Sequence, residues 1–450
     1  MKVGIIGCGF VFDKYMATWG NHPDLVIGGV TDIDHERIDA VTKHYGFKTY
    51  ANCTTLLADP DIDIIANFTP IGTHYQITKA ALEAGKHVYS EKPLCMRMDE
   101  AYELIALAEN RGLRLSCAPS NLLGGTSQTM WKAVADGAIG DVRLVYAEFD
   151  SGPCYLVRSD ILPEDGFPYL RPTSTKSVTG APFPWIKEFE MGCTYEHVGY
   201  HLTWMCAMFG PVESVTAFSK QIMPDKTDRP LDPPDTPDFS VACLDFHSGV
   251  TARITCSIAG PHDLRMRIIG DRGILSADTY DDYEAAVYLE PYSRLSSKAY
   301  YLKVLRDSRL LQRLFGLSLR RLPLIATAPI VPPRSMKHGI RRWDLKGNLA
   351  LIKQAKLSRQ DKCFGIAELA AAVAMDRPHF PSHAFTLHLT ELTLAIQSSG
   401  ARGEAYMTET SFDPIEMPAR TRESGPDYNE FRKARLRARV LGNALERLKG

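Results

Sequence analysis

The sequence predicts an α/β chain: an N-terminal Rossmann-type, doubly wound parallel sheet, then an α+β domain built on a large, mostly antiparallel, open-faced sheet. Three features predict this: a glycine turn after the first apolar run, apolar runs that alternate with helical patterns over about 120 residues, and later alternating runs without helices between them. At 450 residues the chain exceeds one ordinary domain. We place the domains at 1–120 and 121–417, with a basic helical tail at 418–450.

The first residues predict a dinucleotide-binding unit. A strand at Lys2–Ile6 ends in Gly7-Cys8-Gly9, a helical segment follows, and a second strand at 26–30 closes on an acidic residue. Gly7 allows the tight turn, and Gly9 lets the backbone approach a pyrophosphate at the helix N-terminus. The cofactor-binding residues expected here are Gly7, Gly9, Phe10, Val11 and Asp32. Asp32 is placed to accept hydrogen bonds from ribose hydroxyls, so NAD is expected and NADP is disfavoured.

Phe12 departs from this pattern, because it stands where a third small residue usually allows close contact between helix and strand. We interpret it as a tolerated departure that widens the gap. On that interpretation, Phe12→Gly leaves NAD affinity unchanged or improved. The alternative for the whole motif is an ordinary glycine turn, and the strands and acid in register favour the nucleotide site.

The rest of the first domain continues the alternation. The predicted helices and strands are helices at His35–Tyr45, 73–84 and Met98–Asn110, and strands at 63–68, 87–89 and 113–117. Since no hairpin signals separate them, we expect a parallel sheet covered on both faces.

The second domain is predicted from strands that follow one another directly. They lie at 142–149, 212–219, 238–246, 250–258, 265–270 and 273–277. Residues 224–237 hold five prolines and four aspartates and predict a surface loop.

Composition is that of a globular protein, with 45% hydrophobic and 23% charged residues and a net charge of -1. We expect no signal peptide, and no run reaches the about 18 apolar residues of a membrane span. The ten cysteines lack the spacing of zinc or redox pairs, so we expect reduced thiols and a cytoplasmic protein.

Basic residues concentrate in an insert at about 291–346 and in the tail. The insert has thirteen against two acidic ones: Arg294, Lys298, Lys303, Arg306, Arg309, Arg313, Arg320, Arg321, Arg334, Lys337, Arg341, Arg342 and Lys346. Residues 300–322 mix them with leucines and aromatics and predict an amphipathic helix with a basic face. That helix either folds back on the body with a solvated face, or contacts an anionic membrane or a phosphorylated substrate.

Several motifs together resemble the glucose–fructose oxidoreductase / inositol dehydrogenase / rhizopine-catabolism (GFO/IDH/MocA) family. They are Gly7-x-Gly9, Asp32, Thr69-Pro70 with His74, residues 80–88, Glu91-Lys92-Pro93, 192–201 and 364–370. The resemblance implies an NAD(P)-dependent oxidoreductase that moves a hydride between a nicotinamide and a hydroxyl-bearing carbon of a sugar, cyclitol or sugar derivative. It also implies a homo-oligomer, dimer or tetramer, without nucleic acid. Thr69, Pro70, His74, Glu91 and Lys92 are then expected at the cofactor.

The resemblance places Lys92 beside the substrate hydroxyl, often with a cis bond to the following proline. A desolvated lysine near a nicotinamide cation is expected to have a lowered pKa suited to proton transfer. His201 matches the family's acid/base histidine, and His197 replaces the aspartate that orients it. Glu196 is an alternative partner, although a shift of one residue turns it about 100° around a helix. His197 and His201 also have the spacing of a metal pair, but no further ligands are evident, so no metal is expected.

Asn121, Trp185 and Tyr195 are the expected substrate-binding residues. The alternative is helix capping for Asn121 and plain packing for Trp185. Two other functions stay open. One is a transient oxidation that drives elimination or glycoside cleavage and regenerates NAD in each turnover. The other is a non-catalytic, nucleotide-sensing regulator on the same fold.

Overall fold

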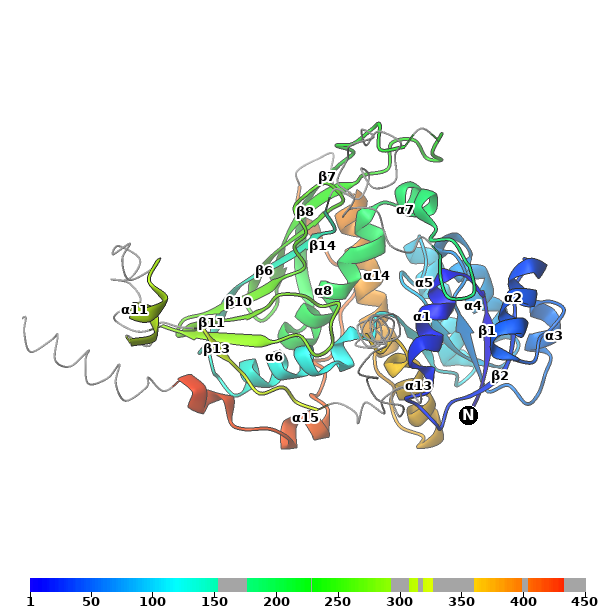
Figure 1. Cartoon of the computed structure of the whole chain (residues 1–450), viewed down its shortest axis with the longest axis horizontal. Coiled ribbons are helices and arrows are strands. Elements are labelled where there is room, and N and C mark those ends of the chain that lie inside the picture. Colours follow the sequence, from blue (N-terminus) through cyan, green and yellow to red (C-terminus); the bar gives the residue numbers. More distant parts are fainter. Residues whose placement is uncertain are drawn as a thin grey trace, which may run out of the picture.

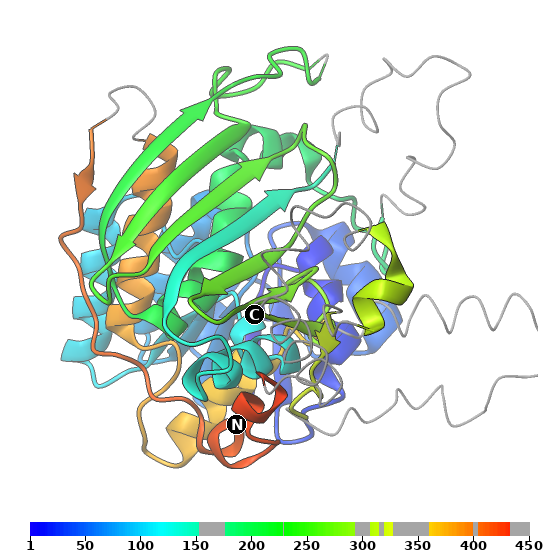
Figure 2. The same ribbon diagram turned by 90° about the vertical axis from the view of Figure 1, so that its left-hand side faces the viewer.

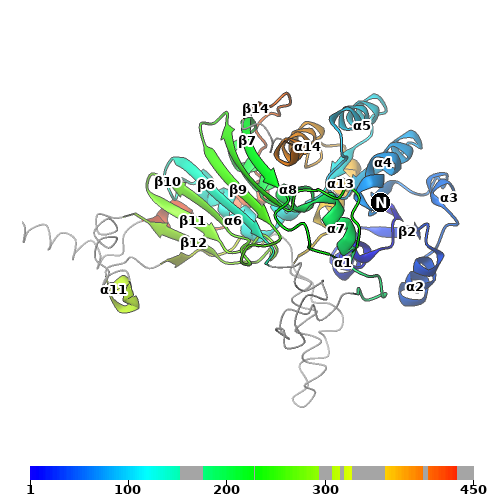
Figure 3. The same ribbon diagram turned by 90° about the horizontal axis from the view of Figure 1, so that it is seen from above.

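The computed structural model describes residues 1–152, 176–227, 229–292, 307–314, 319–326, 360–398 and 404–432. They form two lobes, each built on one sheet, with helices between the sheets (Figures 1 and 3). Both predicted sheet types are confirmed.

The first lobe is a five-stranded parallel sheet in the order β2-β1-β3-β4-β5. Its strands are β1 (Lys2–Ile6), β2 (Val26–Thr31), β3 (Ile64–Asn67), β4 (His87–Ser90) and β5 (Leu115–Cys117). Its helices are α1 (Phe10–Trp19), α2 (His35–Tyr45), α3 (Cys53–Leu57), α4 (His74–Glu83) and α5 (Met98–Asn110), with a 3₁₀ turn at Ile71–Thr73. Because β2 and β3 lie on opposite sides of β1, the chain reverses direction across the sheet there, where such folds bind ligands.

A late segment completes this lobe. Helix α13 (Phe364–Ala374) packs against β4 and β5, and Cys363, just before it, donates from its Sγ to the Tyr15 carbonyl of α1 at 3.2 Å. This late segment therefore lies beside α1, although more than 300 positions separate it from that helix.

The second lobe is a nine-stranded sheet in the order β13-β12-β11-β10-β6-β9-β8-β7-β14. The strands are β6 (Val142–Asp150), β7 (Val212–Lys220), β8 (Phe239–Phe246), β9 (Thr251–Ser257), β10 (Met266–Gly270), β11 (Gly273–Ala277), β12 (Val287–Pro291), β13 (Arg320–Arg321) and β14 (Tyr406–Met407). Neighbours are antiparallel, except that β6 runs parallel to β9.

Helices cover the face of this sheet that is turned towards the first lobe. They are α6 (Gly125–Ala135), α7 (Trp185–Met191), α8 (Cys193–Phe209) and α14 (His383–Ser398). The remaining short helices are α11 (Arg309–Leu314), α15 (Ala419–Glu423) and 3₁₀ turns at Asn121–Leu123 and Tyr428–Arg432. Figure 2 shows the other face of the sheet in front, with these covering helices behind it. On that outer face Arg253 and Arg267 flank the ring of Tyr146, at 4.6 and 5.7 Å from its centre.

The predicted basic helix at 300–322 is wrong in its second half. The described helix is only α11, and Arg320 and Arg321 instead pair with β12 as strand β13. The reason is burial: Leu322 and Ile325 join the core of the second lobe, which draws this end of the segment onto the sheet edge. Most of the insert and the tail beyond 432 lie outside the described residues, so the contact of the insert with an anionic membrane or a phosphorylated substrate stays a prediction. Within the described ranges, no helix has the length and hydropathy needed to cross a bilayer.

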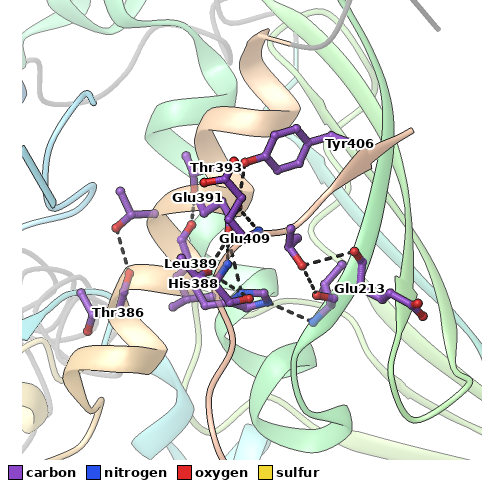
Figure 4. Close-up of polar contacts among 12 residues, drawn as sticks. Glu213, Thr386, His388, Leu389, Glu391, Thr393, Tyr406 and Glu409 are labelled. Atoms are coloured by element: carbon purple, nitrogen blue, oxygen red, sulfur yellow. Dashed lines mark hydrogen bonds and ion pairs between the residues drawn. The ribbon is translucent and has the colours of Figure 1, made fainter. Parts of the chain in front are cut away.

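A buried polar cluster on α14 holds strand β14 and the residues after it next to β7 (Figure 4). From α14, His388 Nε2 accepts a hydrogen bond from the Val212 backbone N–H at 3.0 Å, and Nδ1 lies 2.9 Å from Thr410 Oγ1. Glu391 accepts from the Tyr406 hydroxyl at 2.7 Å and from the Glu409 backbone N–H at 2.6 Å. The cluster thus holds residues 406–410 against β7.

The His388 contacts predict acid sensitivity. A protonated ring would point an N–H at the Val212 N–H, and burial lowers the pKa of His388 to about 4, with Glu391 and Thr410 opposing in part. The folded pKa lies below the ordinary value of 6.5, so stability is complete above about pH 6.5. As the pH falls from there towards 4, His388 should remove up to about 1.4 kcal/mol per pH unit.

Urea unfolding at pH 7.5 and at pH 5 measures this loss. His388→Gln is the matched control, because its amide keeps one acceptor and one donor and does not titrate. The pH slope of that variant should fall by about one proton. Equal slopes in both proteins would show that His388 is not a source of the acid sensitivity.

Candidate active site

The glycine turn has the geometry that a pyrophosphate needs. Gly7 has φ +97°, and a Cβ there would lie 2.7 Å from the backbone carbonyl of Phe68, so only glycine fits. Gly9 caps α1 without a side-chain hydrogen bond, and nothing lies within 4 Å of a Cβ placed on it. The backbone N–H groups of the first turn of α1 are therefore accessible to an anion, and the residues present fit a dinucleotide.

Asp32 is held at this turn. Its carboxylate accepts hydrogen bonds from the backbone N–H of Cys8 at 2.6 Å and of Asp34 at 2.9 Å. A carboxylate that accepts two bonds keeps lone pairs for further donors, such as ribose hydroxyls. The Arg37 guanidinium donates to the Cys8 carbonyl at 2.9 Å, which fixes the turn from its other side.

The interpretation of Phe12 as a gap-widening departure is wrong. Its side chain is fully buried and packs edge-on against the rings of Tyr45 and Phe47, with ring centres 5.9 and 6.5 Å away. The ring fills the space between α1 and the end of α2, so it is a core residue.

A segment of the second lobe reaches over the start of α1. The Thr179 hydroxyl donates to Asp13 at 2.6 Å, and Arg37 donates to the Thr179 carbonyl at 3.0 Å. Phe183 packs edge-on against Phe10, with ring centres 4.8 Å apart, and Trp185 packs on Phe183 at 3.7 Å. Trp185 is thus linked to the predicted cofactor residue Phe10 through one aromatic ring.

Lys92 follows β4, at the carboxyl edge of the parallel sheet. Its ammonium donates to the Glu196 carboxylate at 2.8 Å, and its backbone N–H donates to Glu91 at 3.1 Å. The other Glu91 oxygen accepts from the Tyr15 hydroxyl at 2.7 Å. The Lys92–Pro93 bond is cis, as the resemblance implied.

His74 is a buried support for this edge. Its ring lies between the carbonyls of Pro93, at 2.7 Å, and Thr69, at 2.9 Å, so it joins the loops after β3 and β4. Burial lowers the pKa of His74. Thr69 and Pro70 lead into the 3₁₀ turn at Ile71–Thr73 beside it, at the same edge of the sheet.

The electrostatics of Lys92 differ from the expectation. Burial by itself would lower the pKa of Lys92, but the charge of Glu196, then Tyr200 and Glu91, outweighs it and the pKa is raised. In the protein alone Lys92 is therefore a charged ammonium. Its ability to accept a proton depends on how strongly Glu196 holds it.

Helix α8 presents Glu196 and Tyr200 to Lys92, and not the two histidines. The Lys92 ammonium lies 5.7 Å from the centre of the Tyr200 ring. His197 stacks on Phe149 of the large sheet, with ring centres 3.9 Å apart. His201 is fully buried against the edge of Tyr280, and among the described residues neither ring nitrogen has a hydrogen-bond partner.

The environment of His201 disfavours the charged ring, since burial lowers its pKa to about 4. An acid/base role for His201 and His197 stays a prediction. The geometry favours Glu196 and Tyr200 as the residues of α8 that contact Lys92. They have the same spacing of four residues, which is the signal that sequence reasoning gave too little weight. Among the described residues, no group of three potential metal ligands occurs.

Lys362 is a site residue that sequence reasoning missed. Its ammonium lies 5.9 Å from the centre of the Tyr15 ring and 6.0 Å from that of Tyr200. The available signal was its position, two residues before the family-like segment 364–370.

The predicted substrate residues lie at different distances from this cluster. Asn121 is fully buried and donates to the Tyr200 carbonyl at 3.1 Å, so it helps to hold α8 in place. Tyr195 is half-buried, and its pKa is raised by burial and lowered in part by Ser398 at the end of α14. Their substrate contacts stay predictions.

The Lys92–Glu196 pair makes a pH prediction. Glu196→Gln removes the charge that holds the pKa of Lys92 up while burial still lowers it. If oxidation requires neutral Lys92, the rising limb of kcat/KM against pH should move to lower pH. Glu213→Gln, an exposed substitution on β7, is the control and should leave the limb in place. An unmoved limb in Glu196→Gln would assign it to another group.

Comparison with known proteins agrees with this geometry. The profile described as "Oxidoreductase family, NAD-binding Rossmann fold" matches residues 1–118, and that of the GFO/IDH/MocA C-terminal domain matches 169–276, together half of the chain. The chain belongs to the GFO/IDH/MocA oxidoreductase family. Its first lobe is the NAD-binding Rossmann domain of that family.

Individual relatives of this GFO/IDH/MocA protein match more narrowly. The uncharacterized oxidoreductase YfiI of Bacillus subtilis is 36% identical over 135 residues, which are 28% of this chain and 34% of YfiI. The chain spans less than half of the length of the curated relatives that it matches at this level.

Solved structures show the same fold over nearly the whole chain. Levoglucosan dehydrogenase, in complex with NADH and levoglucosan, has a TM-score of 0.66 at 17% identity and covers 91% of this chain and 100% of its own. The WlbA dehydrogenase of Bordetella pertussis, with NADH and UDP-GlcNAcA, has a TM-score of 0.61 at 17% identity, covering 91% and 97%. At such identities the likeness concerns the fold.

Proposed function

We propose that the protein is an NAD-dependent oxidoreductase acting on a hydroxyl-bearing carbon of a sugar, cyclitol or sugar derivative. The observation that carries this proposal is the position of Lys92. It follows a parallel strand of an NAD-binding domain and meets Glu196 and Tyr200 of the second lobe. Two solved structures of the same fold are named as complexes with NADH and a sugar derivative, which supports the substrate class.

The residues divide the work between binding and proton transfer. The bound nicotinamide supplies the hydride acceptor or donor. Gly7, Gly9 and Asp32 hold the dinucleotide, and Lys92 exchanges the hydroxyl proton with the substrate. Glu196 keeps the ammonium in place, and the Tyr200 ring forms one wall beside it. When a carbonyl is reduced, the charged Lys92 donates its proton to the oxygen; when an alcohol is oxidised, neutral Lys92 accepts it.

Cofactor choice is the first prediction of this proposal. Asp32 would repel a 2′-phosphate and can accept from a free hydroxyl, so the dissociation constant for NAD should be lower than that for NADP. Binding isotherms at one salt concentration measure both. Asp32→Asn should narrow the difference, since the amide keeps an acceptor without the charge. Tighter binding of NADP would contradict the assignment.

The activity itself is tested by a screen of sugars, inositols and nucleotide sugars, followed by NADH absorbance. Net NADH formation supports a dehydrogenase. Product formed without net NADH would favour transient oxidation that drives elimination or glycoside cleavage. NAD binding without turnover of any compound would favour a nucleotide-sensing regulator.

We also propose a homo-oligomer formed through the outer face of the large sheet. Of the residues described on that face or at its edge, Phe218 and Met407 are exposed large apolar side chains. Light scattering after size exclusion gives the mass, and Phe218→Glu should shift an oligomer towards monomer. An unchanged mass would place any interface elsewhere.

A further inference from the structure

Two further lysines, Lys362 and Lys14, lie near the Lys92 site, and Asp281 is an acidic group near both of them. Lys92 is paired with Glu196, and Glu91 is engaged by the Tyr15 hydroxyl and the Lys92 backbone. Among the described residues, the ammonium groups of Lys362 and Lys14 have neither an ion pair nor a hydrogen bond. They come from two further elements, the segment before α13 and the first half of α1.

Lys362 lies where the reacting part of a substrate would sit. Its ammonium and that of Lys92 approach the same Tyr200 ring, at 6.0 and 5.7 Å from its centre. Lys362 is also 5.9 Å from the ring of Tyr15, whose hydroxyl binds Glu91 next to Lys92. A group bound by Lys362 is therefore separated from the proton-transfer centre by no more than one aromatic ring.

The surroundings shift the pKa of both lysines. Burial lowers the pKa of Lys14, and the positive charge of Lys362 lowers it further. Burial would also lower the pKa of Lys362, but Tyr200, Glu91 and Asp281 outweigh it and the pKa is raised. Lys362 is thus a charged group in a partly enclosed site. Glu91 and Asp281 act on it as negative charges, but among the described residues no carboxylate is hydrogen-bonded to its ammonium, so an anionic group of a ligand can bind there directly.

The pyrophosphate of the cofactor is not the best candidate for that anionic group. It belongs at the N-terminus of α1, around Gly9 and Phe10. The Lys14 ammonium lies 5.3 Å from the centre of the Phe10 ring, so Lys14 remains available to that pyrophosphate. The Lys362 ammonium lies instead by the rings of Tyr15 and Tyr200, on the side of Lys92. The remaining ligand at that position is the substrate.

We propose that Lys362 binds an anionic group of the substrate, so that the enzyme acts on a sugar acid or a sugar phosphate rather than on a neutral sugar. The proposal rests on the proposed function for the reaction. It makes Lys362 a residue that determines specificity, while proton transfer stays with Lys92.

Binding to the NAD-loaded protein tests this directly by calorimetry. The probes are matched sets: D-glucose, D-glucuronate and D-glucose 6-phosphate, and the same three forms of D-galactose. An anionic member should bind about 10- to 100-fold more tightly than its neutral partner, the range of a hydrogen bond to a charged group. The acid and phosphate arms show which anion is preferred.

Lys362→Met should remove the preference for the anion and keep the apolar stem of the side chain. Lys362→Arg should retain most of it, because the charge remains. Lys220→Met, at an exposed end of β7, is the matched control and should bind like the wild type. Circular dichroism and NAD affinity confirm that each variant is folded. If Lys362→Met unfolds, two other measurements test the proposal: Lys362→Arg should retain the preference for the anion, and anion binding should weaken as the salt concentration rises.

Three outcomes overturn the proposal: neutral sugars that bind as tightly as both anionic partners, an unchanged preference in Lys362→Met, or a loss of NAD affinity in that variant in place of the preference. The two proposals fail separately. Turnover of neutral sugars only would refute the proposed anion site and leave the proposed oxidoreductase activity supported. Anion binding without NADH formation from any substrate would support the anion site and count against the oxidoreductase activity.

Discussion

Lys92→Ala should lower turnover by about two to four orders of magnitude while the dissociation constant for NAD stays within a few-fold. The ammonium is the cationic group that the fold brings against Glu196 and Tyr200 at the carboxyl edge of β4. Proton transfer takes place in the transition state, so its loss should lower kcat and kcat/KM alike. Steady-state kinetics on the best substrate of the screen, with NAD binding measured in parallel, gives both quantities.

Removing this lysine also leaves Glu196 unpaired in a half-buried position, which costs stability. Lys92→Met is therefore a useful second variant, since it fills the same space. Lys220→Ala controls for the loss of an exposed lysine. Near-normal turnover in both Lys92 variants would show that another group transfers the proton. A parallel loss of NAD binding would show that the effect of the substitution is structural.

Phe12→Ala should lower the free energy of unfolding by about 3–5 kcal/mol, the usual cost of removing a buried phenylalanine. The ring is fully buried, and it packs against Tyr45 and Phe47 at the end of α2 and beyond. Losing it leaves a cavity under the first turn of the nucleotide-binding helix. We therefore also expect weaker NAD binding, because the start of α1 is no longer held against α2.

Urea unfolding followed by circular dichroism measures the loss, and Tyr102→Ala is the matched control. Tyr102 is 43% exposed on α5, so its truncation should cost within about 0.5 kcal/mol. A Phe12 variant as stable as the wild type, with NAD affinity unchanged or improved, would restore the interpretation that the glycine pattern alone suggested.

The Rossmann lobe was predictable because its signals are local. Strand β1 and helices α2 and α5 have the predicted bounds, since apolar periodicity and the flanking turn residues suffice to define them. The Gly7 turn and the acid after β2 were likewise readable, as both follow from backbone geometry within one βαβ unit.

Side-chain partners across the two lobes were not predictable in this way. On α8 the sequence allows either 196 and 200 or 197 and 201 to face Lys92, because both pairs have helical spacing. The rotation of the helix is set by its packing on β8 and β9, which buries His201 and places His197 on Phe149. Phe12 is similar, since its partners Tyr45 and Phe47 are more than thirty positions away.

By itself, then, the sequence determined the NAD-type Rossmann lobe, the sheet lobe after it, and Lys92 as the residue at the end of β4. Only the tertiary structure decided that Glu196 and Tyr200 meet Lys92, that Thr179 reaches the start of α1, and that Lys362 enters the site. The physical reason is the range of the interactions. Hydrophobic periodicity and turn geometry act over a few residues, whereas these contacts arise when Thr179, α8 and the residue Lys362 before α13, far apart in the chain, meet the first lobe near Lys92 and α1.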